Sequence, residues 1–146
     1  MDSEQFVVFT LDNEAYGLPI TRVQEIIRYT TPRTIPDSEP GIRGVICLRS
    51  KIIPVGDTRE LLGIMSVSDE EESNVVIVES ASGPCGLIVD AVTEVIRVDV
   101  DAIETDSSTR ATSGIARIGD KLLVVIDVDA LLPSLNTMMI ALPEAA

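Results

Sequence analysis

The chain contains no histidine and no tryptophan, and its 146 residues include only two phenylalanines and two tyrosines. Histidine is the commonest general base and the commonest metal ligand, so its absence argues against most hydrolytic sites and ordinary zinc sites. Scarce aromatics leave no platform on which nucleobases could stack. A formal net charge of −13 also argues against nucleic acid, because binding phosphate requires a basic surface. The sequence predicts no cofactor and no metal.

Cysteine and long apolar runs are also scarce. Cys47 and Cys85 are the only cysteines, and each lies among apolar residues, so both are expected to be buried, reduced thiols. The longest apolar run, 122–126, is far too short to span a membrane. The first residues are polar and acidic, unlike a signal peptide. These features predict a soluble cytoplasmic protein.

What the sequence does contain is an internal duplication. Residues 44–62 match residues 114–132 at an offset of 70, and residues 6–28 match residues 75–97 at an offset of 69. We call residues 6–62 the first copy and residues 75–132 the second copy. The identical pairs include Gly17/Gly86, Leu18/Leu87, Glu25/Glu94, Arg28/Arg97, Gly44/Gly114, Lys51/Lys121, Val55/Val125 and Asp57/Asp127.

The repeated pattern predicts a mainly β protein. Short runs rich in Val, Ile and Leu recur at spacings typical of all-β folds, and lobes this small close most simply as barrels. We therefore expect two small five-stranded β-barrels with short helices and a C-terminal helix. The expected boundaries are lobe one at about 5–66, a charged linker at about 67–74, lobe two at about 75–132 and the final helix at about 134–142.

Several local predictions follow from turn and helix chemistry. Pro19 can begin a helix, and the apolar spacing after it predicts a short amphipathic helix to about Ile26. The equivalent stretch of the second copy is β-branched and alternating, so 93–98 is read as a strand. Asp57 and Asp127 each follow a strand and are predicted to cap a helical turn, Asp57 with Glu60 in a capping box.

Two features could indicate other functions. Paired carboxylates can serve as acid and base, so a small acidic enzyme using Asp57 and Asp127 is the enzymatic alternative, although capping explains both residues. Charge is also uneven: residues 22–51 hold six basic and three acidic side chains, whereas residues 67–146 hold four and fifteen. A basic zone on an acidic protein suggests a surface for one particular partner.

The segments 16–28, 44–57 and 86–95 resemble, in order, those of the CheW family of chemotaxis coupling proteins. The resemblance covers about residues 5–135 and identifies the chain as a single CheW-like domain, 1–146. It implies two five-stranded barrels flanking a hydrophobic groove. It also implies a non-enzymatic adaptor that links a CheA-type histidine kinase, through its regulatory domain, to the cytoplasmic tips of chemoreceptors. The protein would then be cytoplasmic and recruited to membrane-associated receptor arrays, with no direct membrane insertion.

The resemblance also implies a partner-binding site. The family's Asn-Leu-Arg-Gly turn corresponds to residues 47–50, which makes Arg49 the presumptive partner-binding arginine, with Lys51 beside it. Cys47 replaces the asparagine and Ser50 the glycine; serine is strained there if the turn requires a positive φ. The remaining predicted contacts are Val23, Glu25, Ile26, Ile27, Val92 and Val95. The closest alternative is a CheW-like adaptor of a non-chemotactic kinase pathway.

Overall fold

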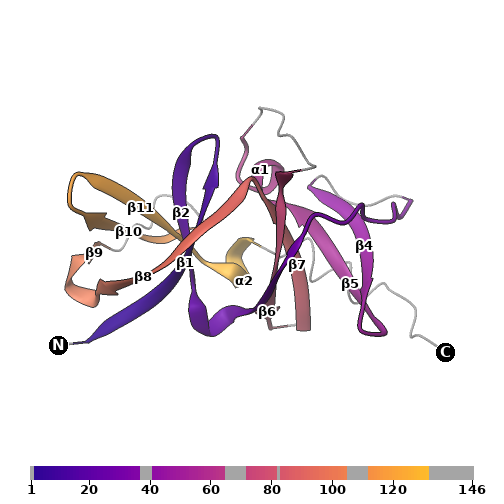
Figure 1. Ribbon diagram of the computed structural model, residues 1–146, viewed down its shortest axis with the longest axis horizontal. Coiled ribbons are helices and arrows are strands. Elements are labelled where there is room, and N and C mark those ends of the chain that lie inside the picture. The colour runs from indigo at the N-terminus through magenta and orange to yellow at the C-terminus, as the bar shows by residue number, and fades with distance from the viewer. Residues whose placement is uncertain (1, 37–40, 65–71, 82, 105–111, 132–146) are drawn as a thin grey trace.

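A computed structural model describes residues 2–36, 41–64, 72–81, 83–104 and 112–131 of the chain, and these residues are dominated by β-strands (Figure 1). The first copy supplies β1 (Ser3–Leu11), β2 (Glu14–Pro19), η1 (Ile20–Arg22), β3 (Val23–Arg28), β4 (Ile42–Leu48), β5 (Lys51–Asp57) and α1 (Thr58–Leu61). The second supplies β6 (Asn74–Ser80), β7 (Gly83–Val89), β8 (Ala91–Asp99), η3 (Val100–Ala102), β9 (Ile103–Glu104), β10 (Thr112–Ile118), β11 (Lys121–Ile126) and α2 (Val128–Leu131).

The strands form two sheets that lie side by side (Figure 1). The first has the order β8-β1-β2-β11-β10-β9, and the second has the order β3-β6-β7-β5-β4. Neighbours are antiparallel except at one place in each sheet, where β11 runs parallel to β2 and β5 runs parallel to β7. The mainly β fold predicted from the sequence is therefore confirmed.

The two copies exchange strands. β1 and β2 of the first copy lie in the sheet built from β8–β11 of the second, while β6 and β7 of the second copy complete the sheet of β3–β5. The equivalence is close: Val125 pairs with Gly17 in one sheet, and Val55 pairs with Gly86 in the other. The expected division into lobes at 5–66 and 75–132 therefore does not correspond to the sheets.

Short connections explain the exchange. If β2 and β3 shared one sheet in the observed order, they would run in the same direction, and the chain would have to return along the length of a strand. A six-residue strand is about 20 Å long, whereas the three residues of η1 can span only about 10 Å. The connection from β7 to β8 is the single residue Asp90. Each connection must instead carry the chain across from one sheet to the other.

Each sheet closes into a small barrel because the chain after one edge strand, β8 or β3, pairs with the strand at the opposite edge. In the first barrel, β8 leads through η3 directly into β9, which pairs with β10. In the second barrel, the segment after β3 returns to β4, where Arg33 and Val45 exchange two backbone hydrogen bonds of 2.8 and 2.9 Å. Gly114 and Gly44 lie at these two closures, each beside a shift in strand register.

Three apolar clusters fill the part of the chain that the structure describes. One lies inside the first barrel around Phe6, and one lies inside the second around Val75. The third joins the barrels, because it combines residues of the first sheet with residues of the second and of α2; it includes Phe9, Leu18, Val76, Leu87, Ile126 and Leu131. Buried surface between the barrels makes them one packed body.

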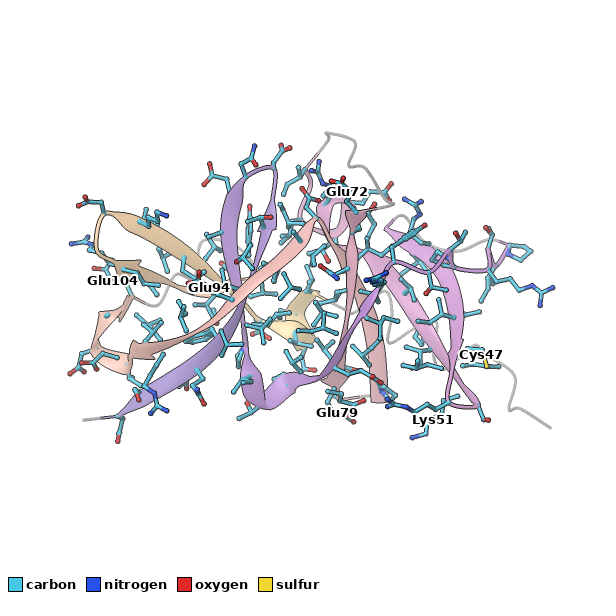
Figure 2. The ribbon with its side chains drawn as sticks, in the orientation of Figure 1. Cys47, Lys51, Glu72, Glu79, Glu94 and Glu104 are labelled. Atoms are coloured by element: carbon cyan, nitrogen blue, oxygen red, sulfur yellow. The ribbon has the colours of Figure 1, made fainter. Side chains whose placement is uncertain are left out.

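Two local predictions were wrong. Residues 19–26 are not a helix: η1 is followed by strand β3, whose side chains alternate between half-buried and exposed positions as it pairs with β6. The apolar spacing there fits both periods, and β-branched residues paired with a neighbouring strand favour the extended form. Cys85 is buried, but Cys47 is exposed because it lies on the outward face of β4 (Figure 2).

Other predictions agree with the structure or fall outside it. β8 confirms the strand expected at 93–98. The C-terminal helix at 134–142 and residues 67–71 of the linker lie outside the described residues. Within the described part of the chain, no helix combines the length and apolar character needed to cross a membrane.

Candidate partner-binding surface

The β4–β5 hairpin turns at Arg49 and Ser50, and both residues have positive φ, 51° and 69°. Two successive residues in this conformation form the tight turn that matches the twist of a hairpin. The turn therefore does require a positive φ at Ser50, the condition under which the sequence predicts strain there. In the second copy, Gly119 has a φ of 60° at the equivalent β10–β11 turn. The first copy thus places a long basic side chain where the second has glycine.

Arg49 reaches across the barrel closure to Glu25 on β3. Its Nη1 donates to Oε1 at 2.7 Å, and its Nη2 donates to Oε2 at 3.1 Å, so the pair is bidentate. The Arg49 side chain remains 76% exposed, whereas that of Glu25 is 25% exposed. A bidentate pair fixes the plane and direction of a guanidinium, although an exposed pair contributes little to stability. Glu25 therefore orients Arg49 while leaving most of its surface free.

Apolar and basic side chains surround this pair. Ile26 follows Glu25 on β3 and is exposed, and Ile52 is exposed beside Cys47 on the hairpin. Lys51 begins β5 and is exposed next to the turn (Figure 2). Gln24 hydrogen-bonds the Glu79 carboxylate at the end of β6, which places an acidic side chain at this same side of β3. The result is a mixed surface on the second barrel.

The structure separates the other predicted contacts from this surface. Val23 and Val92 are half-buried against the cluster between the barrels, and Ile27 is half-buried against the cluster inside the second barrel. Val95 is exposed on β8 of the first barrel, at the position equivalent to Ile26. Glu25 and Arg49 are thus brought into contact. Lys51 follows the same turn, and Ile26 is next to Glu25 on β3 but on its outward face, whereas Val95 lies on the other barrel.

Ile52 and Leu122 were not predicted from the sequence. Both are exposed and occupy equivalent positions of the two copies, near the start of β5 and β11. A sequence signal exists, because Ile52 precedes buried Ile53 and Leu122 precedes buried Leu123. Adjacent strand residues point to opposite faces, so one of each apolar pair must point outward.

Asp57 and Asp127 each accept a hydrogen bond from a backbone N–H in the first turn of a short helix, α1 and α2 respectively. Asp57 accepts a hydrogen bond from the Arg59 N–H at 3.0 Å, and its other oxygen lies 3.2 Å from Arg43. Asp127 accepts from the Ala130 N–H at 3.2 Å. Burial raises the pKa of Asp57, and hydrogen bonding to Arg59 and the charge of Arg43 offset only part of that rise. Both carboxylates already have partners, Asp57 at the end of β5 and Asp127 after β11, and no interaction joins them among the described residues.

Within the described residues, no three or more acidic or cysteine side chains gather where they could hold a metal ion. The exposed groups of this surface are a guanidinium, an ammonium, a thiol, an amide, a carboxylate and aliphatic side chains. Such groups recognise a protein surface through apolar contact and ion pairing.

Comparisons with known proteins identify the family of the chain. The family model of the CheW-like domain matches residues 5–136 of this chain. The chain is 31% identical to the chemotaxis protein CheW of Klebsiella aerogenes over 90% of its own length and 82% of that protein. It is 29% identical to the chemotaxis protein CheW of Bacillus subtilis over 98% of its own length and 95% of that protein.

A solved structure, the scaffolding protein TtCheW of Thermoanaerobacter tengcongensis, superposes with a TM-score of 0.85. It is 37% identical in sequence, and the match covers 90% of this chain and 94% of that one. The chain belongs to the CheW-like family, the chemotaxis adaptors that couple receptors to the kinase CheA.

Proposed function

We propose that this protein acts without catalysis, binding the regulatory domain of a CheA-type kinase and the cytoplasmic tip of a chemoreceptor. We further propose that the surface around Arg49, Lys51 and Ile26 makes one of these contacts. The observation that carries the proposal is the exposed guanidinium of Arg49, held in one orientation by Glu25 beside exposed apolar side chains. The protein would be cytoplasmic and recruited to membrane-associated receptor arrays by these contacts.

The chemistry favours a protein partner with an acidic group next to an apolar patch. Arg49 already has one carboxylate, and its remaining N–H groups and planar face stay accessible. A partner carboxylate could therefore add to the pair without replacing Glu25. Ile26 and Ile52 would supply apolar area that water leaves on binding. Lys51 would increase the attraction at longer range.

The test is co-purification with a CheA-type kinase and receptor tips, using variants that separate charge from fold. Arg49→Glu is expected to weaken ternary assembly about tenfold or more, as expected for loss of a contact in an interface centre. Lys121→Glu is the matched control, because Lys121 is the counterpart of Lys51 on the first barrel's hairpin and undergoes the same change of charge. It is expected to assemble normally.

The double variant Glu25→Arg/Arg49→Glu distinguishes the two roles that Arg49 could have. If Arg49 only closes the barrel, reversing the pair restores assembly. If Arg49 contacts the partner, the double variant stays defective although it folds, and this is the expected result. Normal assembly by Arg49→Glu would contradict the proposed site. Recovery of a kinase without any receptor would contradict the proposed chemoreceptor partner.

A further inference from the structure

The two barrels are joined by two ion-pair clusters. In the first, Arg59 of α1 donates to both carboxylate oxygens of Asp90, the Nε bond being 2.7 Å long. Asp90 also accepts from the Asp12 N–H in the β1–β2 turn at 2.9 Å, and the Asp12 carboxylate lies 3.4 Å from Arg59. The Arg59 side chain is 7% exposed. This cluster joins α1, which follows the second sheet, to a turn of the first.

The second cluster has the same construction at the other junction. Arg22 of η1 donates to the Asp129 carboxylate of α2 at 2.9 Å, and the same oxygen accepts from the Ala81 N–H at 3.1 Å. Ala81 follows β6 as Asp12 follows β1, at the repeat offset of 69. Asp129 corresponds to Arg59 at the offset of 70. Hydrogen bonding to Arg22 lowers the pKa of Asp129, so it is ionised near neutral pH.

The charges of the two clusters are reversed. In the first, the helical turn carries the arginine and the connection between barrels carries the aspartate. In the second, the helical turn carries Asp129 and the connection carries Arg22. As a result, both arginines belong to the first copy, and the carboxylates that accept their hydrogen bonds, Asp90 and Asp129, belong to the second. Asp12, which lies 3.4 Å from Arg59, belongs to the first. Within the pairs Arg59–Asp90 and Arg22–Asp129, opposite charges therefore meet only when strands of one copy pair with strands of the other.

Pairing within a copy would bring like charges together. If β1–β2 occupied the place of β6–β7 beside β5, Arg22 would meet Arg59 at a buried position. If β6–β7 occupied the place of β1–β2 beside β11, Asp90 would meet Asp129. Burying like charges together costs far more than the surface pairing of opposite charges contributes. The short connections prevent such mispairing inside one molecule, but they do not prevent it between two.

We propose that the reversed charges of Arg22, Arg59, Asp90 and Asp129 are a pairing code. During folding, the four charges favour pairing between first-copy and second-copy strands. They disfavour pairing of first-copy strands with the first copy of another molecule, and of second-copy strands with its second copy. Repeated strands need such discrimination, because Gly17 with Leu18 and Gly86 with Leu87 offer a second copy of the chain nearly the same docking surface. The expected consequence is that strands are exchanged between the two copies of one chain and not between two molecules.

The test uses the more exposed cluster, whose side chains are 34% and 45% exposed, because changes there are tolerated best. Arg22→Asp/Asp129→Arg keeps an opposite-charge pair in the native fold but makes both mispaired contacts attractive. Arg22→Ala/Asp129→Ala removes the native pair without creating an attractive mispair. Arg22 Nε also donates to the Glu79 carbonyl oxygen at 2.9 Å. Both variants lose that bond and the bond from the Ala81 N–H to Asp129 equally. Each is refolded from denaturant over a range of protein concentrations, and the oligomer fraction is measured by size-exclusion chromatography with light scattering.

The pairing code predicts that the charge-reversed variant forms roughly tenfold more oligomer on refolding than the alanine variant. A purely stabilising ion pair predicts the opposite order. Reversing all four residues, with Asp12→Asn to remove the carboxylate that would otherwise face Arg59→Asp, restores the code. That fourfold variant is expected to refold as a monomer, whereas independent stabilising pairs predict that it is the worst of the set. Equal oligomer fractions in the reversed and alanine variants, or more oligomer in the fourfold variant than in the twofold one, would overturn the proposal.

Discussion

The backbone of Gly44 lies so close to the carbonyl oxygen of Arg33 that a β-carbon on Gly44 would sit 2.0 Å from that oxygen. This close approach occurs where the second barrel closes. In the first barrel, a β-carbon on Gly114 would likewise sit 2.6 Å from the carbonyl oxygen of Glu104. Glycine recurs at this position of both copies because each barrel closes by direct approach of two backbones.

Gly44→Ala is therefore expected to lower the free energy of unfolding by about 3 kcal/mol or more, since backbone atoms must move. Gly119→Ala is the control, because Gly119 also has positive φ but no described atom lies within 4 Å of its position for a β-carbon. It is expected to cost only about 1 kcal/mol. Urea unfolding measures both, and equal losses would contradict the role given to the close approach.

Ser50 is expected to be replaceable by glycine with a gain in stability. Its φ of 69° is unfavourable for a residue with a β-carbon, so Ser50→Gly should stabilise the fold by about 1 kcal/mol. Ser50→Ala keeps the β-carbon and serves as the control, with little expected change. Thermal unfolding compares the three proteins, and a lower melting temperature for Ser50→Gly would show that the turn is not strained.

Thr58 offers a second stabilising change. Its hydroxyl oxygen is buried and has no hydrogen-bond partner among the described residues, whereas the equivalent position of the second copy holds buried Val128. Thr58→Val preserves shape and removes the unpaired hydroxyl, so stability should rise by about 1–2 kcal/mol. The reverse change, Val128→Thr, should lower it by a similar amount. Chemical denaturation gives both values, and a destabilised Thr58→Val would indicate that the hydroxyl is satisfied.

Acid sensitivity should depend on the ion-pair clusters. Burial alone would raise the pKa of Asp90, but hydrogen bonds from Arg59 and the Asp12 N–H outweigh it, and the pKa is below its ordinary value. The folded state therefore favours the charged form. The stability that this provides is present above about pH 4 and is lost as pH falls through the lowered pKa.

Asp90→Asn is thus expected to be about 2 kcal/mol less stable at neutral pH and to lose less stability on acidification. Asp57→Asn is the contrasting control, because the pKa of Asp57 is raised and its protonation favours the folded state. Removing Asp57 should make the acid loss steeper. Unfolding free energies measured between neutral and acidic pH test both slopes, and parallel curves for the two variants would contradict this assignment.

The sequence revealed the duplication, the β class and the hairpin turns because these depend on local chemistry and repeated identities. It did not reveal the strand exchange, since equivalent strands offer nearly the same pairing surfaces. The sequence feature that indicates the exchange is the short connection at 20–22 between two strands. Predicting a helix over Pro19–Ile26 left no strand after that connection.

The candidate surface was predicted in part for a similar reason. Turn chemistry and the family resemblance indicated Arg49, but its pairing with Glu25 depends on barrel closure, which joins residues far apart in the chain. Cys47 was expected inside because its neighbours are apolar. Strand alternation instead buries Ile46 and exposes Cys47.

The adaptor function can be measured most directly by mixing this protein with a CheA-type kinase and chemoreceptor tips and following kinase autophosphorylation. Receptor-dependent stimulation is expected only when the protein is present, and Arg49→Glu should reduce it while Lys121→Glu does not. Stimulation that is the same with and without the protein would contradict its role as the coupling adaptor.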